Sequence, residues 1–468
     1  MKNNEEKIFT NEFLFKGTTE LKLPEEEKYR EAYKSIFPLD QNIYEISDQQ
    51  WKECFYSKLN DQLNGDLPKN FENVILFLGA GASVKGENWK YGKTMGQIAC
   101  LILGMLYIRD FDDKNPKKFL LTKTNKTDSK DTDKENKNWN LSPQKEDILT
   151  PNEFENIAGL KRGDLCKFLK KGLLGKGPNI NFSLEDFISV LDEMVDLIGN
   201  QSAFLTDADK SLLERAKATD IFIKEKIIKY VQYKNIKFNN EDGFSHLATI
   251  KDIIAKKQGH SKLNVITTNY DMLVEKAAET GNIVVFDGFS FSPEAAFDDS
   301  LFDWNLTKQI EGMNTKEISY NSNVINLLKI HGSINWINKN NKVRRISKYA
   351  NVRKSNERVM IFPSSNKYKQ SYDKPYFELL SRFQNLLHKE NTLLITAGFS
   401  FADDHISRMI LDSLKNKQGL KILVTDYSIA PKNKNWKELD EMRKNSFPVV
   451  FLKATMNGKE HNLDYYLR

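Results

Sequence analysis

Five short apolar runs, each followed by glycine or polar residues, alternate with helical patterns along this chain of 468 residues. This alternation limits the possible folds more than any other feature, because strands that alternate with helices form open, largely parallel sheets. We therefore predict an α/β fold built on an open, mostly parallel sheet. The runs lie at residues 73–79, 263–268, 324–330, 392–396 and 421–425, and residues 448–452 are predicted to add an edge strand.

Long insertions are predicted to divide this sheet along the sequence. We assign residues 71–110 and 260–468 to the α/β domain. Residues 1–70 are polar with short amphipathic stretches, which indicates an N-terminal helical arm. Residues 111–150 consist largely of Lys, Asp, Asn, Thr and Glu, and are predicted to be a mobile polar insertion. Residues 151–259 have helical periodicity and are predicted to form a helical subdomain, with helices that start near 183 and 210.

The composition excludes several classes of protein. The chain has 70 Lys and Arg against 64 Asp and Glu, so its net charge of +6 permits a nucleic-acid partner without requiring one. The longest apolar run, Ile98 to Ile108, is far shorter than the roughly 20 residues that span a membrane, so we expect a cytoplasmic protein. Cys54, Cys100 and Cys166 lie far apart without a Cys-x-x-Cys pair, which excludes a disulfide framework and a structural zinc ribbon.

Parallel α/β sheets bind ligands beyond the carboxyl ends of their strands, so the residues that follow the strands are the candidates for a site. The first is the glycine turn Gly79-Ala80-Gly81-Ala82-Ser83. A glycine turn between a strand and a helix lets the backbone approach a phosphate, and the helix start offers free N–H groups. Val84 stands where a dinucleotide fingerprint has its third glycine, which disfavours an ordinary dehydrogenase. An ordinary tight turn is the alternative interpretation.

The second candidate is the segment from Thr267 to Asp271, which places hydroxyls, an amide and a carboxylate at a strand end. Asn269 can hold a ribose or a water because its amide both donates and accepts hydrogen bonds, and Thr268 is a candidate cofactor contact. In the alternative interpretation, Asp271 caps the next helix and Asn269 shapes the turn. Both interpretations hold together if Asp271 caps and orients at the same time.

The third candidate is His331, which lies at a strand end and is followed by Gly332. A histidine in this position can act as a general base near neutral pH, and the glycine leaves room for a sugar. A structural histidine bonded to the backbone is the alternative.

Further along the chain, Gly398 and Ser400 are candidates for phosphate or ribose contacts, and Asp426 is placed to bind an adenosine ribose or to begin a turn. Asp403, Asp404 and His405 are consecutive and point in different directions at a helix start, so a helix cap explains them better than a metal site. The eight Lys and Arg residues within 339–358 favour a solvated loop over a nucleic-acid surface.

The order of these motifs is more specific than any one of them. Taken together, they resemble the sirtuin-like NAD-cleaving domain of bacterial anti-phage defence proteins, over about residues 71–430. The resemblance implies a Rossmann-like α/β domain of the sirtuin type with NAD as its substrate and no metal ion. It also implies that Asn269 and Asp271 act at the nicotinamide ribose and that His331 is the catalytic base. The implied NAD phosphate contacts are Gly79, Ala80, Gly81 and Ser83.

The zinc cysteines of deacetylase sirtuins are missing here, so a peptide cleft is not expected and hydrolysis of the nicotinamide–ribose bond is the leading hypothesis. The resembling proteins deplete NAD in this way and halt phage growth. A non-catalytic NAD or ADP-ribose sensor and a protein deacetylase are the alternatives. Unrestrained activity would be toxic, so we expect control by self-assembly or by a partner. The resemblance suggests a HerA-type ATPase or an Argonaute protein, with nucleic acid involved only indirectly.

Overall fold

The computed structural model describes fourteen stretches of the chain. They are residues 9–24, 28–36, 47–85, 92–107, 184–200, 206–233, 236–238, 243–309, 318–346, 358–362, 373–416, 419–431, 433–458 and 462–467. The predicted polar insertion at 111–150 and the first part of the predicted helical subdomain lie outside these residues.

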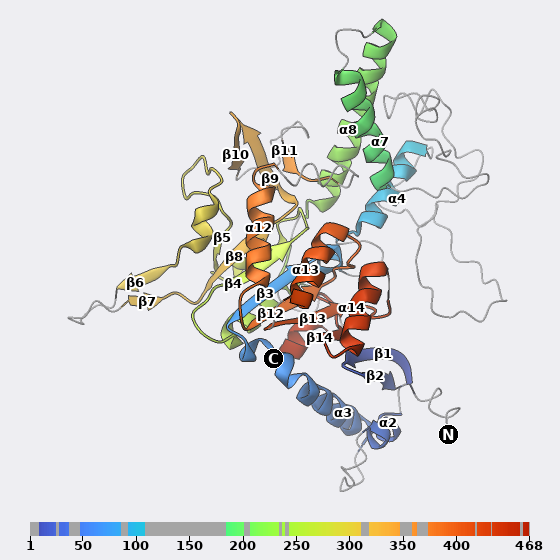
Figure 1. Cartoon of the computed structure of the whole chain (residues 1–468), viewed down its shortest axis with the longest axis vertical. Helices are drawn as coiled ribbons and strands as arrows, with labels where there is room; N and C mark the ends of the chain where they lie inside the picture. Colours follow the sequence, from blue (N-terminus) through green and yellow to red (C-terminus); the bar gives the residue numbers. More distant parts are fainter. Residues whose placement is uncertain are drawn as a thin grey trace, which may run out of the picture.

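A nine-stranded sheet forms the centre of the molecule, and seven neighbouring strands within it run parallel (Figure 1). Each predicted run is present as a strand, and the α/β fold class is confirmed. The edge strand β5 was not predicted, because three residues are too few to give a periodic pattern. In order across the sheet the parallel strands are β14 (Val449–Lys453), β13 (Leu420–Asp426), β12 (Thr392–Ala397), β3 (Asn73–Leu78), β4 (Leu263–Thr267), β8 (Val324–Lys329) and β5 (Val284–Phe286).

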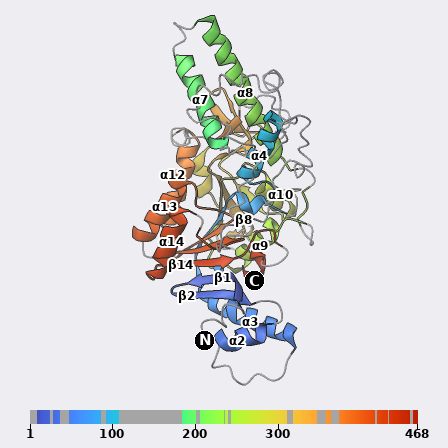
Figure 2. The same cartoon turned by 90° about the vertical axis from the view of Figure 1, so that its right-hand side faces the viewer.

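Helices cover both faces of the sheet (Figure 2). Successive side chains of a strand point to opposite faces, and β3 illustrates this with two apolar sets. Ile75 and Phe77 pack into the cluster that contains α12 (Tyr376–Leu387), α13 (Asp404–Asn416) and α14 (Lys434–Lys444). Val74 and Leu76 pack into the cluster that contains α9 (His246–Lys256), α10 (Leu273–Thr280) and α15 (Leu463–Leu467). Burial on both faces explains why the strands are continuous apolar runs rather than alternating ones.

The N-terminal segment differs from the predicted helical arm. It contains the helices α2 (Tyr29–Ile36) and α3 (Asp48–Leu63), but it begins with the strands β1 (Phe9–Lys16) and β2 (Thr19–Pro24). This hairpin pairs antiparallel with β14 and extends the sheet. The fully buried Arg443 of α14 donates to the Gly17 carbonyl oxygen at 2.7 Å and pairs with Glu20. The prediction of helix for residues 9–24 was wrong, because these stabilising contacts come from distant parts of the sequence.

The helices predicted to start near 183 and 210 are present as α7 (Leu184–Asn200) and α8 (Asp207–Val231). They extend from the sheet as a pair (Figures 1 and 2) and share an apolar cluster with α4 (Met95–Tyr107). The helix α9 falls within the same predicted subdomain, yet it packs against the sheet. No helix within the described residues combines the length and the apolar character needed to cross a membrane.

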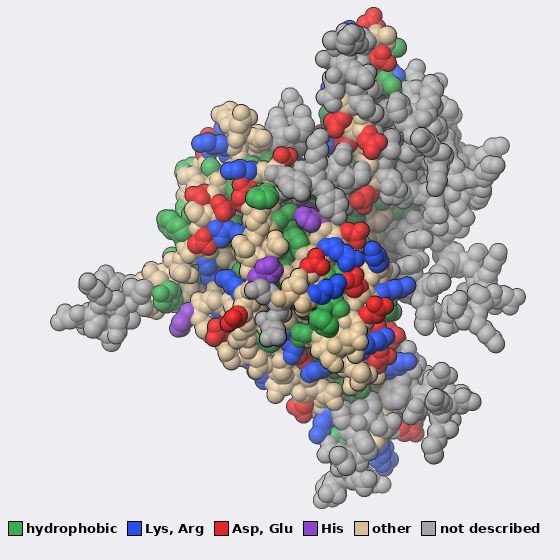
Figure 3. Space-filling model, viewed as in Figure 1, with side chains coloured by type: hydrophobic (Ala, Val, Ile, Leu, Met, Phe, Trp, Pro, Cys, Tyr) green, Lys and Arg blue, Asp and Glu red, His purple; other side chains and the backbone are tan. Residues whose placement is uncertain are grey.

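The basic run at 339–358 is described in part, as strands of a small antiparallel sheet. These are β9 (Gly332–Lys339), β10 (Lys342–Arg345) and β11 (Arg358–Met360). Arg344 pairs with Glu294, and Arg345 pairs with Asp287. Lys and Arg side chains are also interspersed with Asp and Glu over the face in Figure 3, rather than gathered in one basic surface. Lys339, Arg344 and Arg345 of this run therefore belong to local ion pairs, and Arg358 donates to the Ile334 carbonyl oxygen.

His246 at the start of α9 gives a test of the packing of this helix. It is 1% exposed, and burial lowers its pKa from 6.5 to about 3. Below pH 6.5 the His246 side chain binds a proton in the unfolded chain but not in the folded chain. The free energy of unfolding therefore falls as the pH drops below about 6.5. Between pH 7 and pH 5, we expect the free energy of unfolding to fall by about 2 kcal/mol more than in His246→Gln. Urea denaturation at both pH values measures this difference, and equal losses in the two proteins would contradict it.

Candidate functional site

The polar motifs gather at the carboxyl edge of the central strands. β3 lies between β4 and β12, and the chain proceeds from β3 to one side of the sheet and later returns to the other side. Such a reversal of strand order opens a crevice where parallel sheets bind ligands. The segments that follow β3, β4, β8 and β12 therefore share one edge of the sheet at its switch point.

The loop after β3 does not lead directly into an α-helix. Residues Ala80–Ser83 form a short 3₁₀ helix, and the α-helix α4 begins only at Met95. Several N–H groups of this loop are used within the protein. Gly79 donates to the Ala397 carbonyl oxygen at 3.0 Å, Gly81 donates to that of Gly398 at 2.9 Å, and Ala82 and Val84 donate within the loop. The expectation of free N–H groups at a helix start is therefore wrong for these four positions.

Gly398 explains why glycines occur on both sides of this contact. Its φ of +62° is in the left-handed region, and an added Cβ would lie 2.4 Å from the Ala82 nitrogen. The backbones of the loops after β3 and β12 therefore touch directly.

Replacing Gly398 with alanine is expected to lower the free energy of unfolding by about 2–4 kcal/mol, because backbone atoms block the Cβ and the φ is strained. Urea denaturation measures the loss. Gly65→Ala is the matched control, since nothing lies within 4 Å of an added Cβ at Gly65. Equal stability of the two variants would contradict the direct backbone contact.

A buried hydrogen-bond network joins the loop after β3 to the loop after β4. Asn269 Nδ2 donates to the Gly79 carbonyl oxygen at 2.8 Å and to Ser83 Oγ at 2.9 Å. Ser83 Oγ donates in turn to Asp271 Oδ2 at 2.6 Å. The other oxygen of Asp271 accepts from the Leu273 N–H at 3.0 Å, at the start of α10. Asp271 thus binds the first N–H group of α10 and orients the network at the same time.

This network fixes the orientation of the Asn269 amide. Its nitrogen has two hydrogens, and the two hydrogen bonds to Gly79 and Ser83 use both. The carbonyl oxygen of the amide is then the group that can accept a hydrogen bond from a ligand. Ser83 is 3% exposed and engaged on both sides, so it supports Asn269 instead of offering a free hydroxyl to a phosphate.

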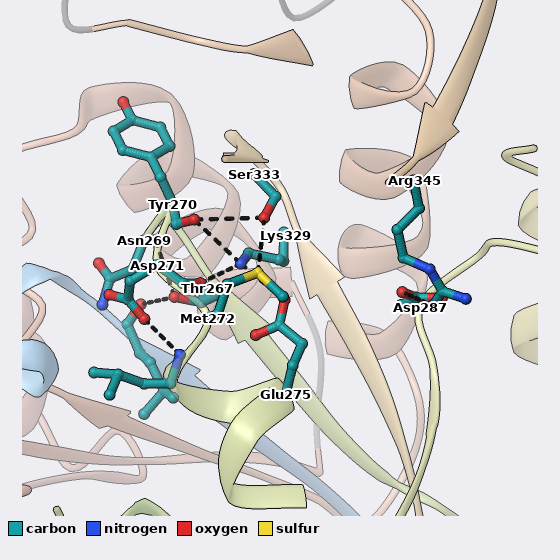
Figure 4. Close-up of polar contacts among 12 residues, drawn as sticks. Thr267, Asn269, Tyr270, Asp271, Met272, Glu275, Asp287, Lys329, Ser333 and Arg345 are labelled. Atoms are coloured by element: carbon teal, nitrogen blue, oxygen red, sulfur yellow. Dashed lines mark hydrogen bonds and ion pairs between the residues drawn. The ribbon is translucent and has the colours of Figure 1, made fainter. Parts of the chain in front are cut away.

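Lys329 is a site residue that sequence reasoning missed (Figure 4). It is 1% exposed, and its ammonium donates to the carbonyl oxygens of Tyr270 and Asp271 and pairs with Glu275 at 2.9 Å. A buried lysine needs such partners, because an isolated charge in the interior is costly. The ammonium therefore fixes the two backbone carbonyl groups that flank the Cα atom of Asp271. A lysine within the apolar run 324–330 was the available signal.

His331 lies beyond the end of β8, next to the segment that carries Asn269. Thr267 pairs in register with Lys329, so Asn269 and His331 each lie two residues beyond paired positions of neighbouring strands. Neighbouring strands are about 4.8 Å apart, which places the two residues on the same part of the sheet edge.

Asp403 faces His331 from the loop after β12. Its Oδ2 lies 3.9 Å from His331 Nε2, and both side chains are largely buried. Its other oxygen accepts from the Ile406 N–H at 3.2 Å, which confirms the predicted helix cap at the start of α13. The proximity to His331 was missed, because a capping pattern says nothing about distant strands.

The remaining predicted site residues lie around this centre. Ala80 is exposed in the loop after β3, and Thr268 donates its N–H to the Leu78 carbonyl oxygen at 3.3 Å. Ser400 is exposed, and its carbonyl oxygen accepts from Asn433 Nδ2 at 2.7 Å. Asp426 is buried at the end of β13 and accepts from the Ser428 N–H at 3.5 Å, as at the start of a turn. Binding roles for all four stay predictions.

Within the stretches that the structure describes, no group of three or more His, Cys, Asp or Glu side chains is arranged to hold a metal ion. Among the consecutive residues Asp403, Asp404 and His405, Asp404 accepts a hydrogen bond from Asn435 Nδ2 at 2.7 Å.

The region that carries Asn269, His331 and Asp403 is similar to a known sequence family. Residues 263–450 match a sequence family described as a SIR2-like domain. No curated protein matches the chain. Residues 263–450 are therefore similar to SIR2-like domains, which bind NAD, and this similarity supports an NAD-related function. The match begins at β4 and omits both β3 and the Gly79–Ser83 loop that follows it, although β3 lies between β4 and β12 in the same sheet.

Proposed function

We propose that this protein is an NAD glycohydrolase, which cleaves the nicotinamide–ribose bond and releases nicotinamide and ADP-ribose. One observation carries the proposal most directly: the oriented Asn269 amide and the His331 imidazole follow the neighbouring strands β4 and β8 of the SIR2-like region, and Asp403 after β12 lies 3.9 Å from that imidazole. Cleavage of this bond needs a group that positions ribose or water and a group that accepts a proton, and this pair of features supplies both.

The glycine loop is assigned to the half of NAD that does not react. Ala80 is exposed and Gly81 is half-buried, so these two positions are the ones we assign to the pyrophosphate. Gly398 stabilises the loop through direct backbone contact with Gly81 and Ala82. We place Thr268, Ser400 and Asp426 along the remaining length of the dinucleotide. Binding energy from this half fixes the reacting sugar in place.

Asn269, Asp271 and His331 are assigned to the reacting half. Nicotinamide leaves as a neutral molecule and takes the bonding electron pair, which leaves an oxocarbenium-like ribose. The Asn269 carbonyl oxygen accepts a hydrogen bond from a ribose hydroxyl or from the attacking water. His331 removes the proton as the oxygen of that water bonds to the sugar carbon. Asp403, 3.9 Å from the imidazole, stabilises the imidazolium that results.

The cysteines favour hydrolysis over peptide deacetylation. The chain has three, and none forms a Cys-x-x-Cys pair that could build the zinc ribbon of deacetylase sirtuins. Cys100 in α4 is buried, and burial raises the pKa of its thiol to about 12, so it stays a neutral thiol. Water is therefore the acceptor that we propose for the ADP-ribosyl group.

We further propose that the reaction depletes NAD in the cytoplasm during anti-phage defence. Such an activity requires restraint, and we assign that restraint to self-assembly or to a defence partner such as a HerA-type ATPase or an Argonaute protein. Equal activity of isolated monomers and of assemblies would remove the reason for this part of the proposal.

A timed assay tests the proposed activity. The purified protein is incubated with NAD, and the release of nicotinamide is measured by chromatography. We expect nicotinamide and ADP-ribose to appear in equal amounts, without an acetylated peptide and faster in the assembled state. Binding of NAD without release would indicate a sensor instead. Release that requires an acetylated peptide would indicate a deacetylase.

A further inference from the structure

The segment after β14 reaches back to the edge of the sheet that carries the site. The Ala454 N–H donates to the Asp426 carbonyl oxygen at 3.1 Å. Asn457 Nδ2 donates to the carbonyl oxygens of Ala82 at 2.6 Å and Val84 at 3.2 Å. The C-terminal segment therefore contacts Asp426 at the end of β13 and the loop after β3, both of which we assign to NAD binding.

We propose that Asn457 is a positioning residue of the NAD site, which holds the Gly79–Ser83 loop in its binding conformation. This inference rests on the proposed function. Asn457 lies beyond the SIR2-like region at 263–450, so the similarity to that family says nothing of it.

The chemistry of asparagine suits this position. The last carbonyl groups of a helix lack partners within the helix, and the Ala82 and Val84 carbonyls lie at the end of the 3₁₀ helix. The Asn457 nitrogen supplies a donor to each of them, and its Oδ1 accepts from the Ser245 N–H at 3.0 Å. One side chain thus satisfies three backbone groups from two distant segments.

The support on which Asn457 rests is well packed. Asn462 Nδ2 donates to Ser245 Oγ at 2.8 Å, and the Leu463 N–H donates to the Thr455 carbonyl oxygen at 2.9 Å. Leu463 belongs to the same buried apolar cluster as Ala82 and α9. The C-terminal segment is therefore fixed to α9 independently of its contact with the loop.

Asn457→Asp tests the role of the two donors. The substitution keeps the shape and the acceptor for Ser245, but it removes both donors and places a carboxylate against two carbonyl oxygens. The loop is assigned to the half of NAD that does not react, so the main effect should be on binding. We expect the KM for NAD and the Kd for ADP-ribose to rise about tenfold or more, and kcat to fall by a smaller factor, because Ser83 of the same loop also supports Asn269. Asn457→Ala, which adds no charge, is also expected to raise the KM for NAD and the Kd for ADP-ribose.

Asn462→Ala is the matched control, because it breaks a side-chain contact of the same segment with α9 and leaves the loop untouched. Its KM is expected to stay within about twofold of the wild-type value. Hydrogen exchange gives a readout without turnover: the amides of Gly81, Ala82 and Val84 should exchange faster in both Asn457 variants than in the wild type or in Asn462→Ala.

Equal shifts in KM and in exchange for the Asn457 and Asn462 variants would overturn the inference, since they would indicate a general loosening of the C-terminal segment. If the wild type neither binds nor cleaves NAD, the proposed function fails. The exchange comparison then decides on its own whether Asn457 holds the loop: faster exchange in its variants alone supports the inference, and unchanged exchange refutes it.

Discussion

His331→Ala is expected to lower kcat for NAD hydrolysis by about 10²- to 10⁴-fold, the usual contribution of a general base. The KM for NAD should change little, because His331 acts on the attacking water and not on the anchored half of the dinucleotide. The substitution removes a polar side chain from the edge of the sheet, so we expect the fold to persist. Timed nicotinamide release and thermal unfolding measure the two effects.

His388→Ala is the matched control for this substitution, because His388 is exposed at the end of α12, away from the strand-end motifs. It should retain wild-type kcat. Asp403→Asn, which removes the carboxylate charge that faces the imidazole, should lower kcat by a smaller factor than His331→Ala. Retained turnover in His331→Ala would refute the assignment of the base.

Asn269→Ala is expected to lower kcat by about 10²-fold, because the ribose or the water loses the group that orients it. Asn269→Asp keeps an acceptor oxygen, but it loses the donors to the Gly79 carbonyl and to Ser83. It also brings a second carboxylate into the network that already contains Asp271. We therefore expect Asn269→Asp to be impaired as well, even though it resembles asparagine in shape.

The control for these variants is Asn385→Ala, a substitution of an exposed asparagine on α12. Nicotinamide release from all three proteins gives the comparison. If Asn269→Ala hydrolyses NAD at the rate of Asn385→Ala, the amide has no part in the reaction, and the account of the site is wrong at its centre.

The parallel sheet could be predicted because its strands are buried on both faces. A strand such as β12 has every residue buried, so it reads as a continuous apolar run that needs no knowledge of its neighbours. The N-terminal hairpin could not be predicted in this way. Its strands depend on pairing with β14 and on the buried Arg443, which lie more than 400 residues away in the sequence.

The sequence was sufficient to place the candidate residues at the strand ends, but it could not predict the contacts that join them. Parallel sheets bind ligands beyond the ends of their strands, which led directly to Asn269, Asp271 and His331 as candidates. The links that orient them join segments far apart in the chain: Ser83 reaches Asp271, and Asp403 reaches His331. Lys329 shows the same limit, because a lysine in an apolar run indicates a special role without naming the carbonyl oxygens that it binds.

A crystal structure of His331→Ala with NAD tests the central claim most directly, because slow turnover should leave the dinucleotide intact. We expect the pyrophosphate against Ala80 and Gly81, and the nicotinamide ribose within hydrogen-bond distance of the Asn269 carbonyl oxygen. The sugar carbon that bears nicotinamide should face the space left by the imidazole. A dinucleotide bound at another part of the molecule, away from both positions 269 and 331, would contradict the account.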